Sequence, residues 1–323
     1  MEKHKEKIQF DNQICEKATL KDIDERTIRN FVKLAESSKR LNEGIGSTKI
    51  LIKKLGLSKN GKLKNAAILL FGKEPRKFFR NNIIKCGRFK GVEKEEFIDI
   101  KDFEGNLFEN LESSMNFLKD HLRISAKIEG LVRKEKWEIP LEAFREAIIN
   151  AMIHRDYSNP GFIYIKVYDS RIIIANPGKL PVELDISDLY KEHESFPRNP
   201  ILAETFYYTG FIDVWGRGSL NILRLLRENQ LEKALFEQSG GYFRIIFSRP
   251  KEKSGGVNGG VNGGVNLLSY IEKNPGKRTS QMINETKIAK RTIERQLKKL
   301  RDEGKIEFSG SAKTGGYFIK NIR

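Results

Sequence analysis

Cysteine and long apolar segments are both scarce in this chain of 323 residues. Its two cysteines, Cys15 and Cys86, are too few for a disulfide framework or a cysteine-based zinc site. The best apolar run, residues 66–71, falls far short of the roughly 20 residues that cross a bilayer. The first seven residues are mostly charged and lack the apolar segment of a secretory signal. We therefore expect a cytoplasmic protein in a reducing compartment, with no membrane partner.

Positive charge is abundant, and it is concentrated near one end of the chain. The formal net charge is +17. Residues 267–323 hold fourteen Lys and Arg against six Asp and Glu, a net charge of +8 on less than a fifth of the chain. A local excess of this kind indicates a polyanionic partner, with nucleic acid the first candidate, although a solubilising surface is the plainer alternative.

Composition divides the chain into four parts. Residues 255–266 read GGVNGGVNGGVN, which cannot offset its ordering entropy by burying a core and is typical of a flexible linker. We expect an α+β N-terminal region over residues 1–139, a second α+β domain over 140–250, the linker over 251–266 and a small domain over 267–323.

A polar stripe marks the helix expected after Pro140. Glu146, Asn150 and His154 recur at intervals of four and lie on one helix face. A carboxylate and an amide one turn apart suit a metal–nucleotide site, in which the amide oxygen binds Mg²⁺ and the carboxylate activates water. From spacing alone, an ordinary solvent-facing helix edge is the better explanation of the stripe.

Four ordered segments extend this pattern: EAIINAMIHRDY (146–157), DSRIIIANPG (169–178), PRNP (197–200) and GRG (216–218). Together they resemble the C-terminal domain of RecG-related transcriptional regulators. That family pairs a histidine-kinase/gyrase-like (GHKL) ATPase domain with a winged helix, often behind a Schlafen/AlbA-type domain. No GxxxxGK[ST] phosphate loop occurs in the sequence, which excludes a helicase motor of that kind.

The resemblance implies a fold and a set of site residues. The fold would be a GHKL (Bergerat-type) α/β sandwich, with the tail of a Schlafen/AlbA-type module before it and a winged helix after it. ATP and Mg²⁺ would be the cofactors, with Glu146 as general base and Asn150 as the Mg²⁺ ligand. The remaining nucleotide-binding positions would be Asn176 and Gly178 near the adenine and Gly216, Arg217 and Gly218 near the phosphates.

Two departures from the family pattern bear on catalysis. Asn176 stands where these ATPases carry an Asp, so the contact to the adenine amino group is uncharged and weaker. Leu180 lies about where a second glycine is expected, and the later glycine-rich turn is short. The resemblance therefore implies ATP binding and leaves hydrolysis open. The segment 154–157 is typical of the family and is either a structural turn or a contact to phosphate or lid.

The basic tail has the pattern of a winged helix-turn-helix. Three short helices are expected, beginning near Leu267, Thr279 and Lys290, followed by two strands that form a wing. The third helix would enter the major groove of double-stranded DNA. A protein-binding role for the same domain is the alternative. The expected DNA contacts are Arg291, Thr292, Arg295, Lys299 and Lys313.

Together these features predict an ATP-binding, DNA-binding transcriptional regulator. In this hypothesis, nucleotide binding changes the oligomeric state, such as formation of a homodimer, or the posture of the tail. Two alternatives stay open: an active DNA-associated ATPase in repair or defence, and a protein-interaction scaffold with a degenerate pocket.

Overall fold

The computed structural model describes residues 9–41, 46–91, 96–129, 132–212, 217–250, 267–286, 290–311 and 315–320. The side chains of residues 125–129, 132–135, 269, 291, 292 and 299 lie outside this description. So does the Gly-rich linker expected over residues 251–266. The chain forms two compact units, one of residues 1–125 and 134–252 and the other of residues 126–133 and 253–323.

A six-stranded mixed sheet organises the first unit, which confirms the α+β class expected from the sequence. Only the β3–β7 pair is parallel; the other neighbours are antiparallel. The strand order is β4 (Glu96–Phe103), β3 (Ile84–Lys90), β7 (Ile163–Val167), β8 (Arg171–Pro177), β10 (Tyr242–Ser248) and β9 (Leu235–Ser239).

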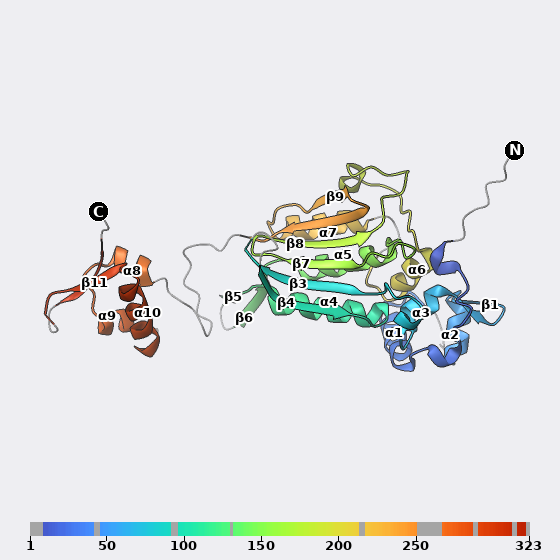
Figure 1. Ribbon diagram of the computed structural model, residues 1–323, viewed down its shortest axis with the longest axis horizontal. Helices are drawn as coiled ribbons and strands as arrows, with labels where there is room; N and C mark the ends of the chain where they lie inside the picture. The colour runs from blue at the N-terminus through green and yellow to red at the C-terminus, as the bar shows by residue number, and fades with distance from the viewer. Residues whose placement is uncertain are drawn as a thin grey trace. The chain divides into compact units, whose positions relative to one another are not determined.

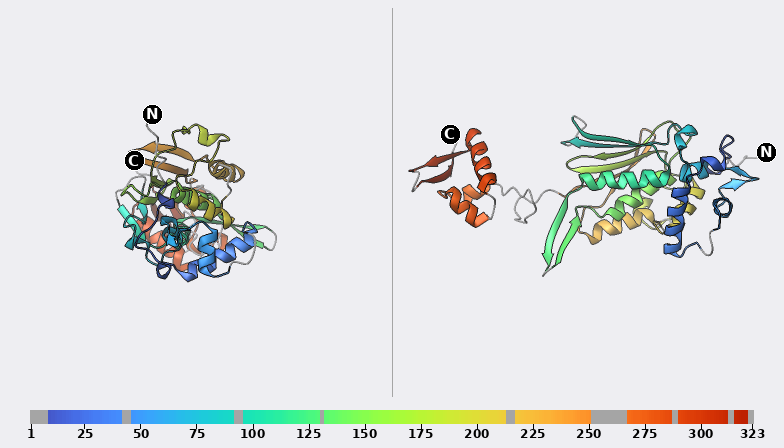
Figure 2. Two further views of the ribbon diagram at one scale, coloured as in Figure 1. Left: turned by 90° about the vertical axis from the view of Figure 1, so that its right-hand side faces the viewer. Right: turned by 90° about the horizontal axis from the view of Figure 1, so that it is seen from below.

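Helices cover one face of this sheet (Figures 1 and 2). The strand side chains beneath them are apolar; Ile165 of β7, for example, is fully buried beside Ile174 of β8. The covering helices are α4 (Leu107–His121), α5 (Leu141–Ile153) and α7 (Gly218–Glu228). At one end of the sheet lie α1 (Glu25–Ser38), α2 (Thr48–Lys54), α3 (Asn65–Phe71) and α6 (Pro200–Tyr208). A small hairpin of β1 (Ser58–Lys59) and β2 (Lys62–Leu63) completes the unit. A second hairpin, β5 (Ile124–Glu129) with β6 (Val132–Trp137), starts and ends in this unit, and its residues 126–133 are assigned to the other one.

The sequence Asn-Pro-Gly at residues 176–178 predicts that the strand stops at residue 175, but β8 ends later. The strand continues through Asn176 and Pro177, which pair with Phe243 and Tyr242 of β10. It ends at Gly178, whose φ of +135° is open to glycine and strained for other residues. The strand therefore carries Asn176 one step further into the sheet than the sequence indicates.

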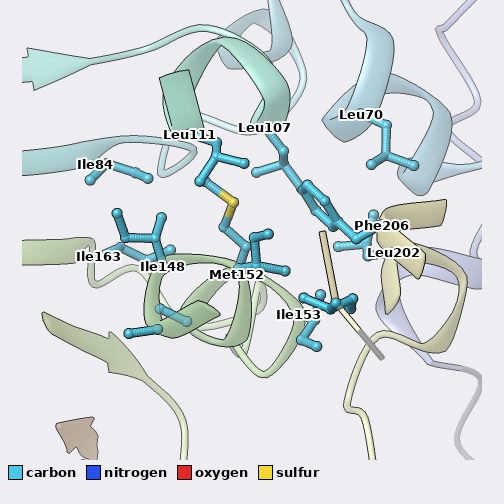
Figure 3. Packing of buried hydrophobic residues seen from close by; sticks show 14 of the residues in the cluster. Leu70, Ile84, Leu107, Leu111, Ile148, Met152, Ile153, Ile163, Leu202 and Phe206 are labelled. Carbon is cyan, nitrogen blue, oxygen red and sulfur yellow. The ribbon is translucent and has the colours of Figure 1, made fainter. Parts of the chain in front are cut away.

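One hydrophobic core runs through the first unit. Figure 3 shows Leu70 of α3 and Leu107 of α4 close to Met152 of α5 and Phe206 of α6. These side chains come from both sides of the boundary expected at residues 139/140, and the same buried cluster extends from Cys15 to Phe247. Residues 1–139 and 140–250 thus share a core.

The N-terminal segment also supports α6 by a specific polar contact. Asp11 is fully buried, and its carboxylate accepts hydrogen bonds from the backbone N–H groups of Ile201 (2.7 Å) and Leu202 (3.3 Å). Asp11 therefore satisfies free donors in the first turn of α6, where a negative charge is favourable. Its neighbour Phe10 stacks on Tyr157 with ring centroids 5.5 Å apart.

The second unit has a core of its own. Its described elements are α8 (Leu267–Lys273), α9 (Thr279–Thr286), α10 (Lys290–Asp302) and the antiparallel pair β11 (Ile306–Ser309) and β12 (Gly316–Ile319). Leu267, Ile271, Met282, Ile293 and Leu297 are its buried centre. On α10, the spacing of Ile293, Leu297 and Leu300 predicts a buried stripe, of which the first two are buried and Leu300 is partly buried. Thr279 is the first residue of α9. Among the described helices of the whole chain, none combines the length and hydropathy needed to span a membrane.

Candidate functional site

Glu146 and Asn150 lie together on α5, as their spacing predicts. The opposite face of α5 packs Phe144, Ile148 and Met152 into the core, which fixes the orientation of the helix. Glu146 is only 4% exposed, Asn150 is half-buried, and the amide Nδ2 approaches the carboxylate Oε1 at 3.5 Å. The amide oxygen of Asn150 is thereby left on the side away from this contact.

Gly218 at the start of α7 meets the same two side chains. A Cβ atom added to Gly218 would lie 2.6 Å from Glu146 Oε1 and 2.8 Å from Asn150 Nδ2. Only a glycine lets the α7 N-terminus approach α5 this closely. Backbone N–H groups at a helix N-terminus favour bound anions, so the juxtaposition places an anion-binding element beside a carboxylate and an amide.

The two other residues of the expected phosphate turn are less closely placed. Arg217 precedes α7, and its exposed side chain approaches Glu192 at 3.9 Å. Gly216 lies outside the described residues.

Asn176 and Gly178 reach the site from the end of β8. Asn176 is 4% exposed, and its Nδ2 donates to the carbonyl of Pro177 at a long 3.4 Å. A Cβ on Gly178 would lie 3.2 Å from the carbonyl oxygen of His154, so a larger residue would press on the turn after α5. The absence of a side chain at Gly178 therefore allows the end of β8 to lie against this turn.

These residues surround a cavity of about 630 Å³. Glu146, Asn150, Asn176 and Gly218 contribute to its lining. Apolar side chains form much of the remaining wall; among them are Leu180, Leu184, Leu189, Ile222, Phe236 and Ile245. A concave site with a few convergent polar groups and an apolar wall is typical of small-molecule binding.

Cationic and imidazole groups lie around the cavity. Burial, together with the positive charge of Arg198, lowers the pKa of His154 to about 4, so this side chain is neutral at pH 7. His193 comes from the segment between β8 and α6 and lies 3.4 Å from the hydroxyl of Ser219, the second residue of α7. Spacing gave no signal for His193 or Ser219, because only the fold brings them to Gly218.

Residues 155–157 form a structural turn. Arg155 is 1% exposed and donates to the backbone carbonyls of Asn81 (2.7 Å) and Gly161 (2.6 Å). Tyr157 is also buried, and its hydroxyl donates to the carbonyl of Met152 at 3.1 Å. The side-chain amide of Asn199 donates to the carbonyl of Arg155 at 2.8 Å and to that of Ile153, the last residue of α5, at 2.9 Å. Of the two interpretations that the sequence allows, these contacts favour the turn.

The donor set at the cavity can be compared with what Mg²⁺ requires. Within the described ranges, no three His, Cys, Asp or Glu side chains gather so as to hold a metal ion by themselves. Mg²⁺ bound with a nucleotide keeps several waters and phosphate oxygens, and it needs only one or two protein oxygens. Asn150 Oδ1 and the Glu146 carboxylate fit that smaller requirement.

The residues expected to contact DNA are only partly described. Arg295 is exposed on α10, away from the buried Ile293 and Leu297. The side chains of Arg291, Thr292 and Lys299, and the whole of Lys313, lie outside the described residues.

Comparison with known proteins gives two family matches and a structural one. The family described as "Putative ATP-dependent DNA helicase recG C-terminal" matches residues 161–247, a range that includes Asn176, Gly178 and Gly218 but not α5. A domain of unknown function (DUF8451) matches residues 1–81. No curated protein matches the chain.

One of the solved structures that match is the crystal structure of the DIP2311 protein from Corynebacterium diphtheriae, with a TM-score of 0.62 and 20% identity. The match covers 97% of this chain and 64% of that one, so this chain spans under two thirds of its length. At this identity the likeness concerns the fold. Together with the cavity, the match over residues 161–247 identifies a RecG-related ATPase-like domain in the first unit.

Proposed function

We propose that the first unit binds Mg-ATP in the cavity and that the second unit binds double-stranded DNA, so that the protein acts as a nucleotide-responsive transcriptional regulator. One observation carries the nucleotide half: Glu146, Asn150 and the first residue of α7 converge at the cavity wall. The same three groups are used in a GHKL ATPase site, where the phosphates bind at a helix N-terminus beside a carboxylate and an amide.

Each part of the cavity wall has a task in this proposal. The α7 N-terminus binds the phosphates, and Arg217, which precedes α7 outside the cavity lining, adds positive charge beside them. Asn150 Oδ1 would hold Mg²⁺, which supplies charge neutralisation of the phosphate oxygens when bound. Asn176 offers its amide to the purine edge, and the apolar wall that includes Leu180 and Phe236 excludes water from the base.

Calorimetry with Mg-ATP tests the nucleotide half. The expected result is saturable binding to the full chain, weakened at least tenfold by Asn150→Ala. Asn116→Ala is the matched control, because Asn116 is an exposed amide on α4, apart from the cavity lining. Absence of binding, together with no rise in melting temperature on adding Mg-ATP, would instead support a scaffold with a degenerate pocket.

The DNA half rests on charge and on the elements of the second unit. Three helices followed by an antiparallel hairpin, with Arg295 exposed on the third helix, are what a winged helix requires. In a duplex-binding titration by fluorescence anisotropy, Arg295→Ala should reduce the slope of log K against log salt by about 0.9 if Arg295 neutralises one phosphate. Lys62→Ala, an exposed cation of the first unit, should leave that slope unchanged.

An active ATPase is the second candidate, and the buried Glu146 carboxylate beside Gly218 is the observation that favours it. In that role Glu146 accepts a proton from the attacking water. Multiple-turnover phosphate release that Glu146→Gln abolishes, while Mg-ATP binding persists, would establish this activity. Tight binding without turnover would favour the regulator, and light scattering with and without Mg-ATP would then test for nucleotide-linked dimerisation.

A further inference from the structure

The buried amide of Asn176 lies among apolar groups of the cavity wall. Every second residue of a strand points to the same face of the sheet, so Asn176 shares the helix-covered face with the buried Ile172 and Ile174. Phe243 is its partner on β10, and partners across an antiparallel pair also lie on one face. Asn176 and Phe243 both line the cavity, so the fold presents an amide and an aromatic ring to it side by side.

A second ring and a leucine extend the apolar surface beside this amide. The rings of Phe243 and Phe236 are nearly parallel, with an interplanar angle of 16° and centroids 6.2 Å apart. Leu180, also in the lining, is held by its backbone N–H, which donates to the side-chain oxygen of Gln238 at 2.7 Å. The wall around Asn176 therefore offers one hydrogen-bonding group bordered by apolar ones, which suits the edge and the faces of a heterocyclic base.

The hydrogen bonds of the Asn176 side chain hold its amide only weakly. Nδ2 donates to the carbonyl of Pro177 at 3.4 Å, which is long for a hydrogen bond, and none of the described residues donates to Oδ1. Asn199 shows the contrast, because its amide donates to two carbonyls at 2.9 and 2.8 Å. The amide of Asn176 can therefore rotate by half a turn about χ2, a torsion with two nearly equivalent minima, at the loss of one weak bond.

A purely structural role for this amide is the alternative, and the strand end does not require it. The carbonyl of Pro177 already accepts a hydrogen bond from the backbone N–H of Asp156 at 2.8 Å. That bond ties the end of β8 to the turn after α5 without the side chain of Asn176. The amide is left to serve the cavity.

The two orientations of an amide fit two classes of purine. An amide presents a donor and an acceptor side by side. In one orientation it accepts from the 6-amino group of adenine and donates to the unprotonated N1. After half a turn it donates to the 6-oxo group of hypoxanthine or guanine and accepts from N1–H. Each class thus makes two hydrogen bonds, and neither leaves the buried amide unpaired.

We infer that the cavity binds 6-oxo purine nucleotides as well as ATP, and that Asn176 recognises position 6 of the base. This inference rests on the proposed nucleotide function and names the class of nucleotide that the site accepts. The contact with Pro177 is kept in only one orientation of the amide, so the affinities for the two classes should differ by about tenfold at most, the worth of one hydrogen bond.

Calorimetry on the full chain with Mg²⁺ and three triphosphates tests the inference. Inosine triphosphate differs from ATP only at positions 6 and 1 of the base, and purine riboside triphosphate has no group at position 6. ATP and inosine triphosphate should bind within about tenfold of each other. Purine riboside triphosphate should bind more weakly than ATP by about fivefold or more, because the amide oxygen loses its donor.

Asn176→Leu keeps the size of the side chain and removes both of its hydrogen-bonding groups. This variant should bind the three triphosphates with equal affinities and should bind ATP more weakly by about fivefold or more. Asn116→Leu makes the same exchange at an exposed position of α4 and should leave all three affinities unchanged. If Asn176→Leu fails to fold, Asn176→Ser, whose hydroxyl is too short to replace the amide, carries the same expectation.

The outcomes separate this inference from the proposed function on which it rests. Affinities for ATP and inosine triphosphate that differ by more than about tenfold would overturn the inference and leave ATP binding established. The same holds if the three triphosphates keep their ranking in Asn176→Leu. If the unchanged protein binds none of the three, the proposed nucleotide function fails, and the inference fails with it.

Discussion

The contact between Gly218 and the two polar side chains of α5 gives the sharpest test of the cavity. In Gly218→Ala the new methyl carbon would start 2.6 Å from Glu146 Oε1 and 2.8 Å from Asn150 Nδ2. An ordinary van der Waals contact begins near 3.4 Å, so the carboxylate must move away from the methyl group by about 0.8 Å and the amide by about 0.6 Å. Both are the far ends of side chains, and they can yield without moving the backbone.

Gly218→Ala should change nucleotide affinity much more than thermal stability. Alanine is favoured over glycine in a helix by up to about 1 kcal/mol, which offsets part of the cost of the displaced side chains. The melting temperature should therefore change by only about 2 to 4 °C, the shift that roughly 1 kcal/mol produces in a unit of this size. Nucleotide affinity should fall at least tenfold, or by about 1.4 kcal/mol, because the methyl group occupies the space between α7 and the carboxylate–amide pair.

Calorimetry with Mg-ATP and thermal melting of the same samples would measure both quantities. Asn116→Ala is the control, since Asn116 is exposed on α4 and is not one of the residues that line the cavity. The reasoning is refuted if Gly218→Ala binds Mg-ATP as tightly as the unchanged protein. It is equally refuted if binding and the melting temperature collapse together, because the methyl would then be disrupting the fold.

Two predictions concern stability. Glu138 accepts hydrogen bonds from the buried Arg249 at 3.0 and 2.6 Å. Burial raises the pKa of Glu138, but the hydrogen bonds from its arginine and backbone partners lower it by more, so the net shift is downward. Glu138→Gln leaves that arginine without its counter-ion, so it should cost about 3 kcal/mol and lower the melting temperature by about 6 to 12 °C, whereas Glu16→Gln, in the exposed pair with Lys62, should cost under about 1 kcal/mol. The pKa of His154 is about 4 in the folded protein and about 6.5 in the unfolded chain. As the pH drops from 6.5 towards 4, the unfolded chain therefore binds a proton that the folded protein does not, and the free energy of unfolding falls by up to about 3 kcal/mol. Denaturant unfolding at pH 7.0, 5.5 and 4.5 should show that loss, and His154→Gln should reduce it; an unchanged pH dependence in the variant would contradict the assignment.

Local patterns in the sequence predicted much of the secondary structure. Proline in the first turn and apolar residues at helical spacing predict a helix over Pro200–Tyr208, and α6 has these bounds. The edge strands β4 and β9 were not predicted. Half of the residues of β4 are charged and most of its side chains are exposed, so it shows no alternating apolar pattern.

The sequence predicted only those contacts of the site that form within a single helix or strand. The spacing of Glu146 and Asn150 on one helix face is a local property, and the structure places them together at the cavity. Gly218 follows them by more than sixty residues, and its contact with them depends on how α7 packs on α5. His193 and Asp11 gave no sequence signal, since their partners come from distant segments of the chain.

The buried Asp11 limits where this chain can be cut into fragments that keep the cavity. The helix that it supports, α6, contributes Pro200, Ala203 and Tyr207 to the cavity wall. A fragment cut at residue 140 would lose this carboxylate and would leave the Phe10-contacting side of Tyr157 uncovered. The segments matched by two separate families, residues 1–81 and 161–247, therefore complete each other physically. Replacing either segment would have to preserve a contact between residues 190 positions apart in the sequence.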